Sequence, residues 1–136
     1  MSRILLDTSG YSALLRGDAR VLSRIQEADV IVVTPIVLGE LKAGFSMGKH
    51  KEKNRRELSR FLQSPRVAVL PLDEETSERW AVIVSSLRRV GTPIPTNDLW
   101  IAASAMQHGV AVLTMDSHFE KVPQIIAEVC SARTDL

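Results

Sequence analysis

Four acidic residues lie far apart in this sequence, yet each is placed where folding could bring it to a shared site: Asp7, Glu40, Asp98 and Asp116. Asp7 directly follows the apolar run 4–6, and Asp116 follows the apolar run 111–115. Both runs are typical of buried strands, whose carboxyl ends border the ligand crevice of open α/β sheets. The other two acids fall in segments with helical patterns. Carboxylate oxygens favour hard cations such as Mg²⁺ or Mn²⁺, whereas zinc prefers imidazole or thiolate ligands.

Glu40 gives the strongest indication of a site. Its neighbours at three and four residues along a helix are all small or apolar: Ile36, Val37, Ala43 and Gly44. Its carboxylate therefore emerges from the apolar side of the helix, where an unpaired charge is costly or takes up a proton. Lys42 points elsewhere on the helix, so no local cation is expected. A divalent ion shared by the four carboxylates would relieve the repulsion that otherwise raises their pKa values.

Each aspartate also has a structural explanation that the sequence leaves open. Asp7 and Asp116 could cap the turns that follow them, and Asp98 could be favoured by the dipole of the helix that it begins. The three histidines are expected outside the acidic group: His50, His108 and His118. His118 is the nearest of them, two residues after Asp116, and is interpreted as a residue of a helix surface.

The charge is distributed unevenly along the chain, although the net charge is only +1. The stretch 42–66 carries eight basic residues against Glu52 and Glu57, which gives it a net charge of +6 and leaves −5 for the rest. Its basic residues are Lys42, Lys49, Lys51, Lys53, Arg55, Arg56, Arg60 and Arg66. A basic arm near an acidic metal site is suited to a polyanionic substrate, although a solvated helix surface also explains it.

Short apolar runs alternate with helical patterns along the chain, which predicts an α/β fold with a parallel sheet covered on both faces. Strands are expected at 3–6, 30–33, 67–70 and 111–114. Helices are expected at 9–15, 19–27, 35 to about 44–48, 49–62, 74–90 and 97–108. Thr34 can cap the third helix and Pro35 can begin it, while Gly91 and Gly109 mark helix ends. The segment 125–129 could be a fifth strand or a helical turn.

Composition limits the organisation of the chain. Its 136 residues, 45% of them hydrophobic, predict a single domain over 1–136. Cys130 is the only cysteine, so neither an intrachain disulfide nor a thiolate zinc cluster is expected. This cysteine content fits a protein of the reducing cytoplasm. Charge interrupts the N-terminus too early for an export signal, and the longest apolar stretch is too short to span a bilayer.

Four motifs in register carry a resemblance to a known family. They are Leu6-Asp7-Thr8-Ser9, the Thr-x5-Glu-Leu-x2-Gly pattern over 34–44, Ile94-Pro95-Thr96-Asn97-Asp98 with the apolar run after it, and Thr114-Met115-Asp116-Ser117-His118-Phe119. With these motifs the chain resembles PIN domains, and among them the VapC-type ribonuclease toxins of toxin–antitoxin pairs. The resemblance covers the chain from Ile4 to about Val129. Met115 departs from it, since the family often has a polar residue there.

The resemblance implies a three-layer fold with about five parallel strands, and a Mg²⁺- or Mn²⁺-dependent endoribonuclease. It implies that the catalytic and metal-binding residues are Asp7, Glu40, Asp98 and Asp116. Three hydroxyls near them are expected to support the carboxylates or metal-bound waters: Thr8, Ser9 and Thr114. The RNA backbone is expected to contact basic residues of the arm: Lys49, Lys51, Lys53, Arg55 and Arg56. The implied partners are an RNA substrate, a VapB-like antitoxin and a second copy of the chain.

Other functions stay open. A receiver-like phosphotransfer domain would need an acidic pair before its first phospho-acceptor strand and a lysine after the last strand, but Asp7 stands alone and Lys121 is poorly placed. A module that keeps the fold and has lost activity is opposed by the complete set of four acids. A dinucleotide-binding domain is weaker still, because no Gly-x-Gly-x-x-Gly motif follows the first strand.

Overall fold

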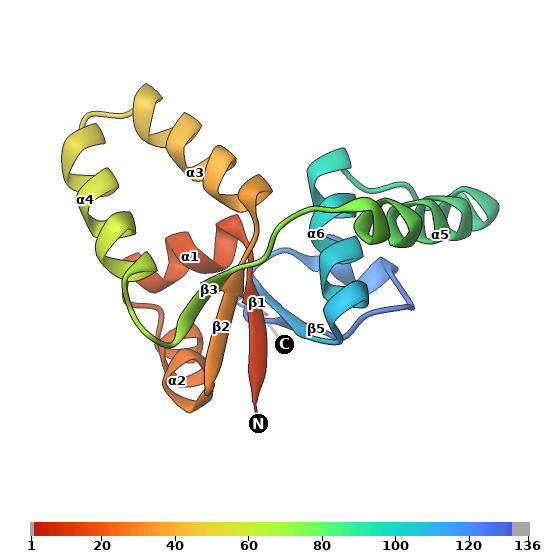
Figure 1. The fold of residues 1–136 in the computed structure, drawn as a ribbon, viewed down its shortest axis with the longest axis horizontal. Helices are drawn as coiled ribbons and strands as arrows, with labels where there is room; N and C mark the ends of the chain where they lie inside the picture. Colours follow the sequence, from red (N-terminus) through yellow and green to blue (C-terminus); the bar gives the residue numbers. More distant parts are fainter. Residues whose placement is uncertain (1, 132–136) are drawn as a thin grey trace, which may run out of the picture.

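The computed structural model of the protein describes residues 2–131, which form a five-stranded parallel sheet with helices on both faces (Figure 1). The strands are β1 (Arg3–Leu6), β2 (Val30–Val33), β3 (Val67–Val69), β4 (Ala111–Thr114) and β5 (Ala127–Val129). The helices are α1 (Thr8–Leu15), α2 (Ala19–Glu27), α3 (Pro35–Met47), α4 (Lys51–Leu62), α5 (Glu74–Val90), α6 (Thr96–His108) and the short 3₁₀ helix η1 (Ser117–Lys121). The predicted fold class is confirmed.

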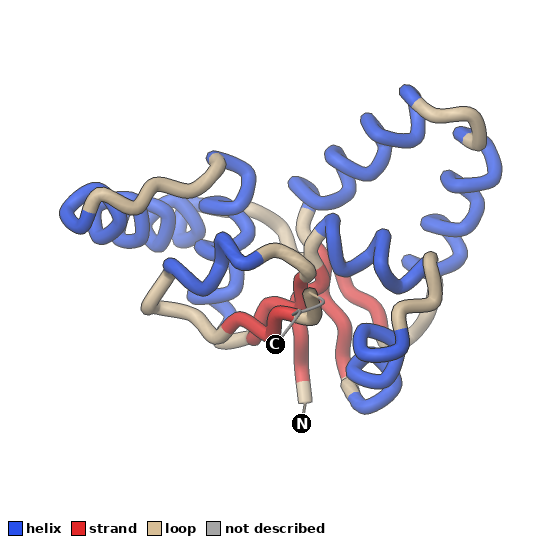
Figure 2. Tube along the Cα trace, turned by 180° about the vertical axis from the view of Figure 1, so that it is seen from behind, coloured by secondary structure: helices blue, strands red, loops and turns tan. Residues whose placement is uncertain are grey.

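The strand order is β3-β2-β1-β4-β5, so the chain reverses its direction across the sheet between β1 and β4. Because crossovers between parallel strands are right-handed, the connections on the two sides of this point place their helices on opposite faces. Figures 1 and 2 show α1 to α4 on one face and α5 with α6 on the other. Ligands of open α/β sheets bind at such a reversal, outside the carboxyl ends of the strands.

Helix boundaries follow from local chemistry. Thr34 Oγ1 accepts a hydrogen bond from the Val37 N–H at 3.4 Å, and Pro35 begins α3 without an N–H that would need a partner. Gly91 ends α5 with φ 70° and Gly109 ends α6 with φ 64°, a left-handed conformation that other residues adopt only with strain. These predicted boundaries are confirmed.

The central strands and α6 make most of the core. Ile4, Leu5 and Leu6 of β1 are fully buried, since parallel strands with helices on both faces have no solvent side. Five apolar residues of α6 are buried as well: Leu99, Ile101, Ala102, Ala103 and Ala105. Trp100 stacks on Trp80 of α5 with ring centroids 5.4 Å apart. The predicted central position of α6 follows from this burial.

Three details differ from or complete the sequence interpretation. The segment after η1 forms the edge strand β5, whose Ala127 pairs with Val112 of β4. Helix α4 begins at Lys51, two residues later than predicted. Arg66 donates hydrogen bonds to the backbone oxygens of Ile25 and Ala28, so this member of the basic stretch caps the end of α2.

None of the helices within residues 2–131 is long and apolar enough to cross a membrane.

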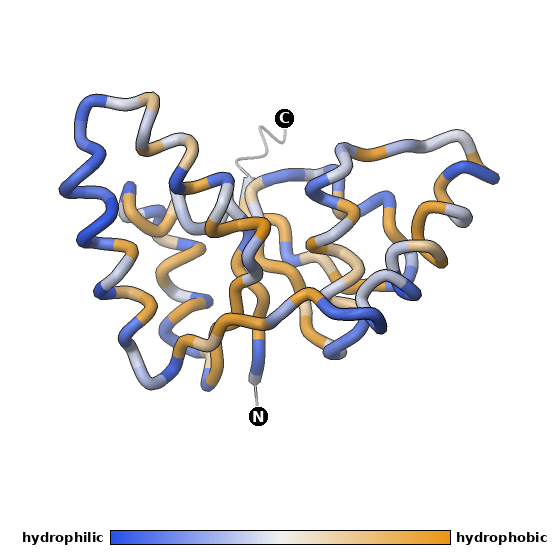
Figure 3. Tube along the Cα trace, turned by 45° about the horizontal axis from the view of Figure 1, so that its top comes forward, coloured by the Kyte–Doolittle hydropathy of each residue, from blue (hydrophilic) through white to orange (hydrophobic). Residues whose placement is uncertain are grey.

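The basic helix α4 stands at the periphery. Figure 1 places it on the side of α3 that faces away from α6, and Figure 3 shows hydrophilic residues along much of its length. Most of its residues are exposed, and only Leu58 is buried. The sequence predicted a basic arm near the acidic site, and the structure puts α3 between the two.

Candidate metal centre

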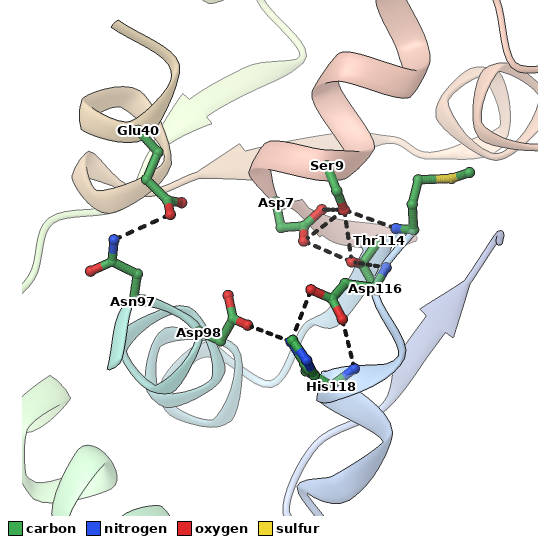
Figure 4. A network of polar contacts seen from close by, with 9 residues as sticks. Asp7, Ser9, Glu40, Asn97, Asp98, Thr114, Asp116 and His118 are labelled. Atoms are coloured by element: carbon green, nitrogen blue, oxygen red, sulfur yellow. Dashed lines mark hydrogen bonds and ion pairs between the residues drawn. The ribbon is translucent and has the colours of Figure 1, made fainter. Parts of the chain in front are cut away.

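The four predicted acids come from four separate segments and meet at the reversal of the sheet. Asp7 follows β1, Asp116 comes two residues after β4, Glu40 lies on α3 and Asp98 lies in the first turn of α6. Figure 4 shows the four carboxylates directed toward a common space between α3, α6 and the ends of β1 and β4. The open cavity there has a volume of about 440 Å³ and is lined by Glu40, Pro95, Thr96, Asn97, Asp98, Asp116 and His118.

Asp7 is the most deeply buried of the four acids, with only 4% of its surface exposed. It caps α1, because its Oδ1 accepts a hydrogen bond from the Gly10 N–H at 2.7 Å. Thr114 Oγ1 donates to Oδ2 at 2.7 Å, and the Ser9 hydroxyl lies 3.0 Å from both oxygens. A carboxylate has about four acceptor positions, and these neighbours supply three hydrogens. One position is therefore left for a water or a cation.

Gly10 lets α1 approach the strand ends closely enough for this cap. A Cβ atom at this position would lie 2.6 Å from the Leu113 backbone oxygen and 2.7 Å from Leu6 Cδ1. It would also lie 3.1 Å from Asp7 Oδ1. A side chain at this position would therefore push α1 away from β1 and β4, and with it the carboxylate that α1 orients.

Glu40 is half-buried and held from two sides. Thr8 Oγ1 donates to its Oε1 at 2.6 Å, and Asn97 Nδ2 donates to its Oε2 at 3.1 Å. The side chain thus connects α3 to α1 and to α6. Both donors are neutral, so the carboxylate is oriented while its charge stays available to the cavity. Sequence patterns did not indicate Asn97 in this role, because the contact joins residues 57 positions apart.

His118 corrects the sequence interpretation, which placed it on a helix surface away from the acids. Because η1 starts directly after Asp116, its first turn carries the imidazole back over the cavity. Nδ1 lies 3.0 Å from Asp116 Oδ2 and 3.3 Å from Asp98 Oδ2, as Figure 4 shows. The expectation that all three histidines lie outside the acidic group is therefore wrong for His118.

Burial has the largest effect on the titration of two of these acids. It raises the pKa of Asp7 from 3.8 to about 6, against the lowering effect of the hydrogen bonds from Thr114, Gly10 and Ser9. Burial also raises the pKa of Asp98, with smaller contributions from the charges of Asp116 and Glu40. Mutual repulsion between the acids, from which raised pKa values were expected, is the lesser cause here.

The cluster has an excess of negative charge. Within residues 2–131, no lysine or arginine forms an ion pair with any of the four acids, and His118 is their one basic partner. One ligand atom each from Asp98, Asp116 and His118 lie within 4.8 Å of one another, a spacing that a single ion can bridge. These three residues therefore suit a divalent cation. Glu40 lies across the cavity from them, and Asp7 lies buried beside it.

Comparison with known proteins decides the family. A model of the PIN domain matches residues 4–125. Ribonuclease VapC4 of Mycobacterium tuberculosis is 40% identical over 93 residues, which cover 68% of this chain and 72% of that protein. This chain belongs to the PIN domain family, in its VapC group. Ribonuclease VapC5 of the same organism is 30% identical over 115 residues, which cover 85% of this PIN domain and 84% of the relative.

A solved structure supports the same assignment. The crystal structure of VapBC2 from Rickettsia felis, bound to a DNA fragment from its promoter, contains a chain that superposes on this PIN domain with a TM-score of 0.81. The two chains are 25% identical, and the match covers 93% of this one and 98% of that one. The receiver-like and dinucleotide-binding alternatives are thereby set aside, because fold, motifs and relatives agree on the PIN domain.

The remaining predicted residues of the PIN domain fall into two groups. Thr8, Ser9 and Thr114 all contact the acids: the first donates to Glu40 and the other two surround Asp7. The five basic residues predicted to bind RNA are all exposed and lie in or beside α4. Of these, Lys53 is within 3.9 Å of Glu57, and Arg55 borders a cavity of about 430 Å³ between α3 and α4 that Lys42 also lines.

Proposed function

We propose that this protein is a VapC-type endoribonuclease toxin that requires Mg²⁺ or Mn²⁺ and hydrolyses RNA phosphodiester bonds in the acidic cavity. One observation supports this most directly: the carboxylates of Glu40, Asp98 and Asp116 line one open cavity with the buried Asp7 beside them, and no lysine or arginine among the described residues neutralises them. A cation shared by these groups would offset their gathered negative charge. The family supplies the reaction class, since its VapC relatives are named as ribonucleases.

In this mechanism Asp98 and Asp116 would hold the cation, and Asp7 would contribute its remaining acceptor position. A bound Mg²⁺ or Mn²⁺ supplies positive charge to the attacked phosphate and makes a bound water more acidic. Glu40 lies on α3 and faces Asp98 and Asp116 across the cavity. Each of its oxygens accepts one protein hydrogen bond, so each keeps a free lone pair that can orient the attacking water and take its proton.

The three hydroxyls keep these carboxylates in place. Thr114 and Ser9 contact each other at 3.1 Å and both contact Asp7, while the Asp116 N–H donates to Thr114 Oγ1 at 2.9 Å. This network links the acid that follows β1 to the acid that follows β4. Thr8 holds Glu40 in place by donating a hydrogen bond to its carboxylate. Partners of this kind orient metal ligands and typically change metal affinity by about 10- to 100-fold when they are removed.

Metal-dependent cleavage of RNA tests the proposal. We expect the purified protein to cut RNA in Mg²⁺ or Mn²⁺ and to be inactive in EDTA, with activity restored when either ion is added back. Sequencing of RNA ends after brief expression in cells, beside an Asp7→Asn control, should reveal new internal ends only with the unaltered protein. Absence of cleavage with both ions on total RNA would instead favour a PIN-fold module that binds without catalysis.

The basic helix is proposed to hold the RNA backbone. Replacing Lys51, Arg55 and Arg56 by Gln should weaken RNA binding and flatten its dependence on salt, lowering the logarithmic slope by about two for single strands. The slope is measured from dissociation constants at increasing salt. As a control, the same change is made at three arginines of α5: Arg79, Arg88 and Arg89. An equal loss of slope in both triple variants would show only a general effect of charge.

An antitoxin is the proposed regulator, since the similar solved structure is a VapBC complex. An arginine or lysine presented by such a partner would supply positive charge to the same carboxylates, so inhibition would be electrostatic as well as steric. The open cavity leaves room for that side chain. A homodimer and a cytoplasmic location are proposed with it, from the family resemblance and from the single cysteine.

A further inference from the structure

Of the ionisable residues that line the cavity, His118 is the one that the proposed mechanism does not use. Its backbone N–H donates to Asp116 Oδ1 at 2.9 Å, while its ring nitrogen faces Asp116 Oδ2 and Asp98 Oδ2. The side chain is 42% exposed, so the ring reaches into the cavity and is not a packed part of the core. A ring held beside two carboxylates at the mouth of a cavity is available to a ligand.

The geometry matches that of neighbouring ligands on one ion. In an octahedral site with bonds of about 2.1 Å, adjacent ligand atoms lie about 3 Å apart. The Nδ1 atom of His118 lies 3.0 Å and 3.3 Å from the two aspartate oxygens. Hydrogen bonds have similar lengths, so distance alone does not separate the two arrangements. The common direction of all three groups toward the cavity favours a shared ion.

We propose that His118 gives the cation site a nitrogen ligand and thereby makes it prefer Mn²⁺ over Mg²⁺. This inference rests on the proposed metal-dependent function and specifies it further. Mg²⁺ is a hard ion that keeps oxygen ligands and waters, whereas Mn²⁺ and Co²⁺ accept imidazole nitrogen more readily. A site with two aspartates and one imidazole on the same wall therefore gains more from Mn²⁺ than a site of carboxylates alone.

The other histidines provide a control. His50 precedes α4, is exposed and makes no side-chain hydrogen bond to that helix. His108 is the last residue of α6, at the end opposite to Asp98. Neither lines the acidic cavity. The His50→Ala variant thus removes an imidazole of this chain without altering the proposed site.

The test measures cation binding in the absence of RNA. Calorimetric titration of metal-free protein should give Mn²⁺ an affinity about tenfold or more above that of Mg²⁺. In His118→Ala the Mn²⁺ affinity should fall about tenfold and the Mg²⁺ affinity less than about twofold. His50→Ala should match the unaltered protein. The preserved Mg²⁺ affinity also shows that the variant has folded with its carboxylates in place.

Pulsed electron paramagnetic resonance of bound Mn²⁺ gives a direct second measurement. We expect coupling to an imidazole ¹⁴N nucleus in the unaltered protein and in His50→Ala, and its loss in His118→Ala. Absent coupling in the unaltered protein, or equal losses of affinity for both ions, would overturn the inference. Metal-dependent RNA cleavage would then still stand. If the unaltered protein neither bound a divalent ion nor cut RNA, the proposed function itself would fail.

Discussion

Replacement of Asp116 by Asn should lower the rate of RNA cleavage by about a thousandfold. The amide removes one charged ligand from the wall that Asp98 and Asp116 share, and a cation contributes several kcal/mol to the stabilisation of charge in such a reaction. A loss of about 4 kcal/mol corresponds to three powers of ten in rate. Single-turnover cleavage of a short RNA at saturating Mg²⁺ or Mn²⁺ gives the comparison.

The matched control is Asp18→Asn. Asp18 is also a capping aspartate, since its Oδ1 accepts from the Arg20 and Val21 N–H groups at the start of α2, but it lies outside the cavity. Asn caps helices about as well as Asp, so both variants should fold. The metal-free Asp116→Asn protein should be at least as heat-stable as the unaltered one. A marked loss of its stability, or similar activities of the two variants, would assign Asp116 a capping role only.

Local chemistry explains why most of the fold could be predicted from the sequence. The start of α3 at Thr34 and Pro35 and the ends of α5 and α6 at Gly91 and Gly109 depend on residues next to each other in the chain. The strands β1 and β4 were recognisable because burial on both faces requires continuous apolar runs. Strand β5 was not, because its three half-buried residues become a strand only by pairing with β4.

Some residues of the candidate site could likewise be predicted from the sequence, and others could not. The convergence of Asp7 and Asp116 could be predicted because the ends of neighbouring parallel strands meet at one edge, and the structure brings both to the cavity with Glu40 and Asp98. Their catalytic role stays a prediction. The positions of His118 and Asn97 could not be predicted, because each depends on which distant element faces the residue. The role of Arg66 could not be predicted either, because it caps α2 through contacts with residues that are distant in the sequence.

Asp7→Asn should unfold at a temperature roughly 5 °C higher than the unaltered protein at pH 7 in EDTA. Burial raises the pKa of Asp7 from 3.8 to about 6, so at neutral pH the folded protein holds a charged carboxylate at a cost in free energy. A tenfold change in proton affinity corresponds to about 1.4 kcal/mol, so this rise in pKa sets an upper limit of about 3 kcal/mol. Rearranged hydrogen bonds reduce the gain to about 1–2 kcal/mol, or a few degrees.

The surrounding groups can accept an amide. Its oxygen can receive the Gly10 N–H, and its nitrogen can donate to Thr114 Oγ1. The Thr114 hydroxyl can then turn to Ser9 Oγ, which lies 3.1 Å away. No buried donor or acceptor is left without a partner by this exchange, so the removal of the charge dominates the change in stability.

The dependence on pH separates this explanation from a general effect of the substitution. Because the folded protein binds the Asp7 proton more tightly than the unfolded chain does, the stability that the proton provides is complete below pH 3.8 and is lost as the pH rises through about 6. At pH 4 only the cost of the rearranged hydrogen bonds counts, so Asp7→Asn should be less stable there by about 1 kcal/mol, and it should gain its full advantage above pH 6. Thermal unfolding across this range in EDTA measures it, with Asp18→Asn measured alongside as a change at a capping aspartate outside the cavity. Addition of Mg²⁺ or Mn²⁺ should stabilise the unaltered protein more than Asp7→Asn, because only the unaltered carboxylate binds the ion. A variant that is less stable at every pH would mean that the carboxylate caps α1 more strongly than its burial disfavours it.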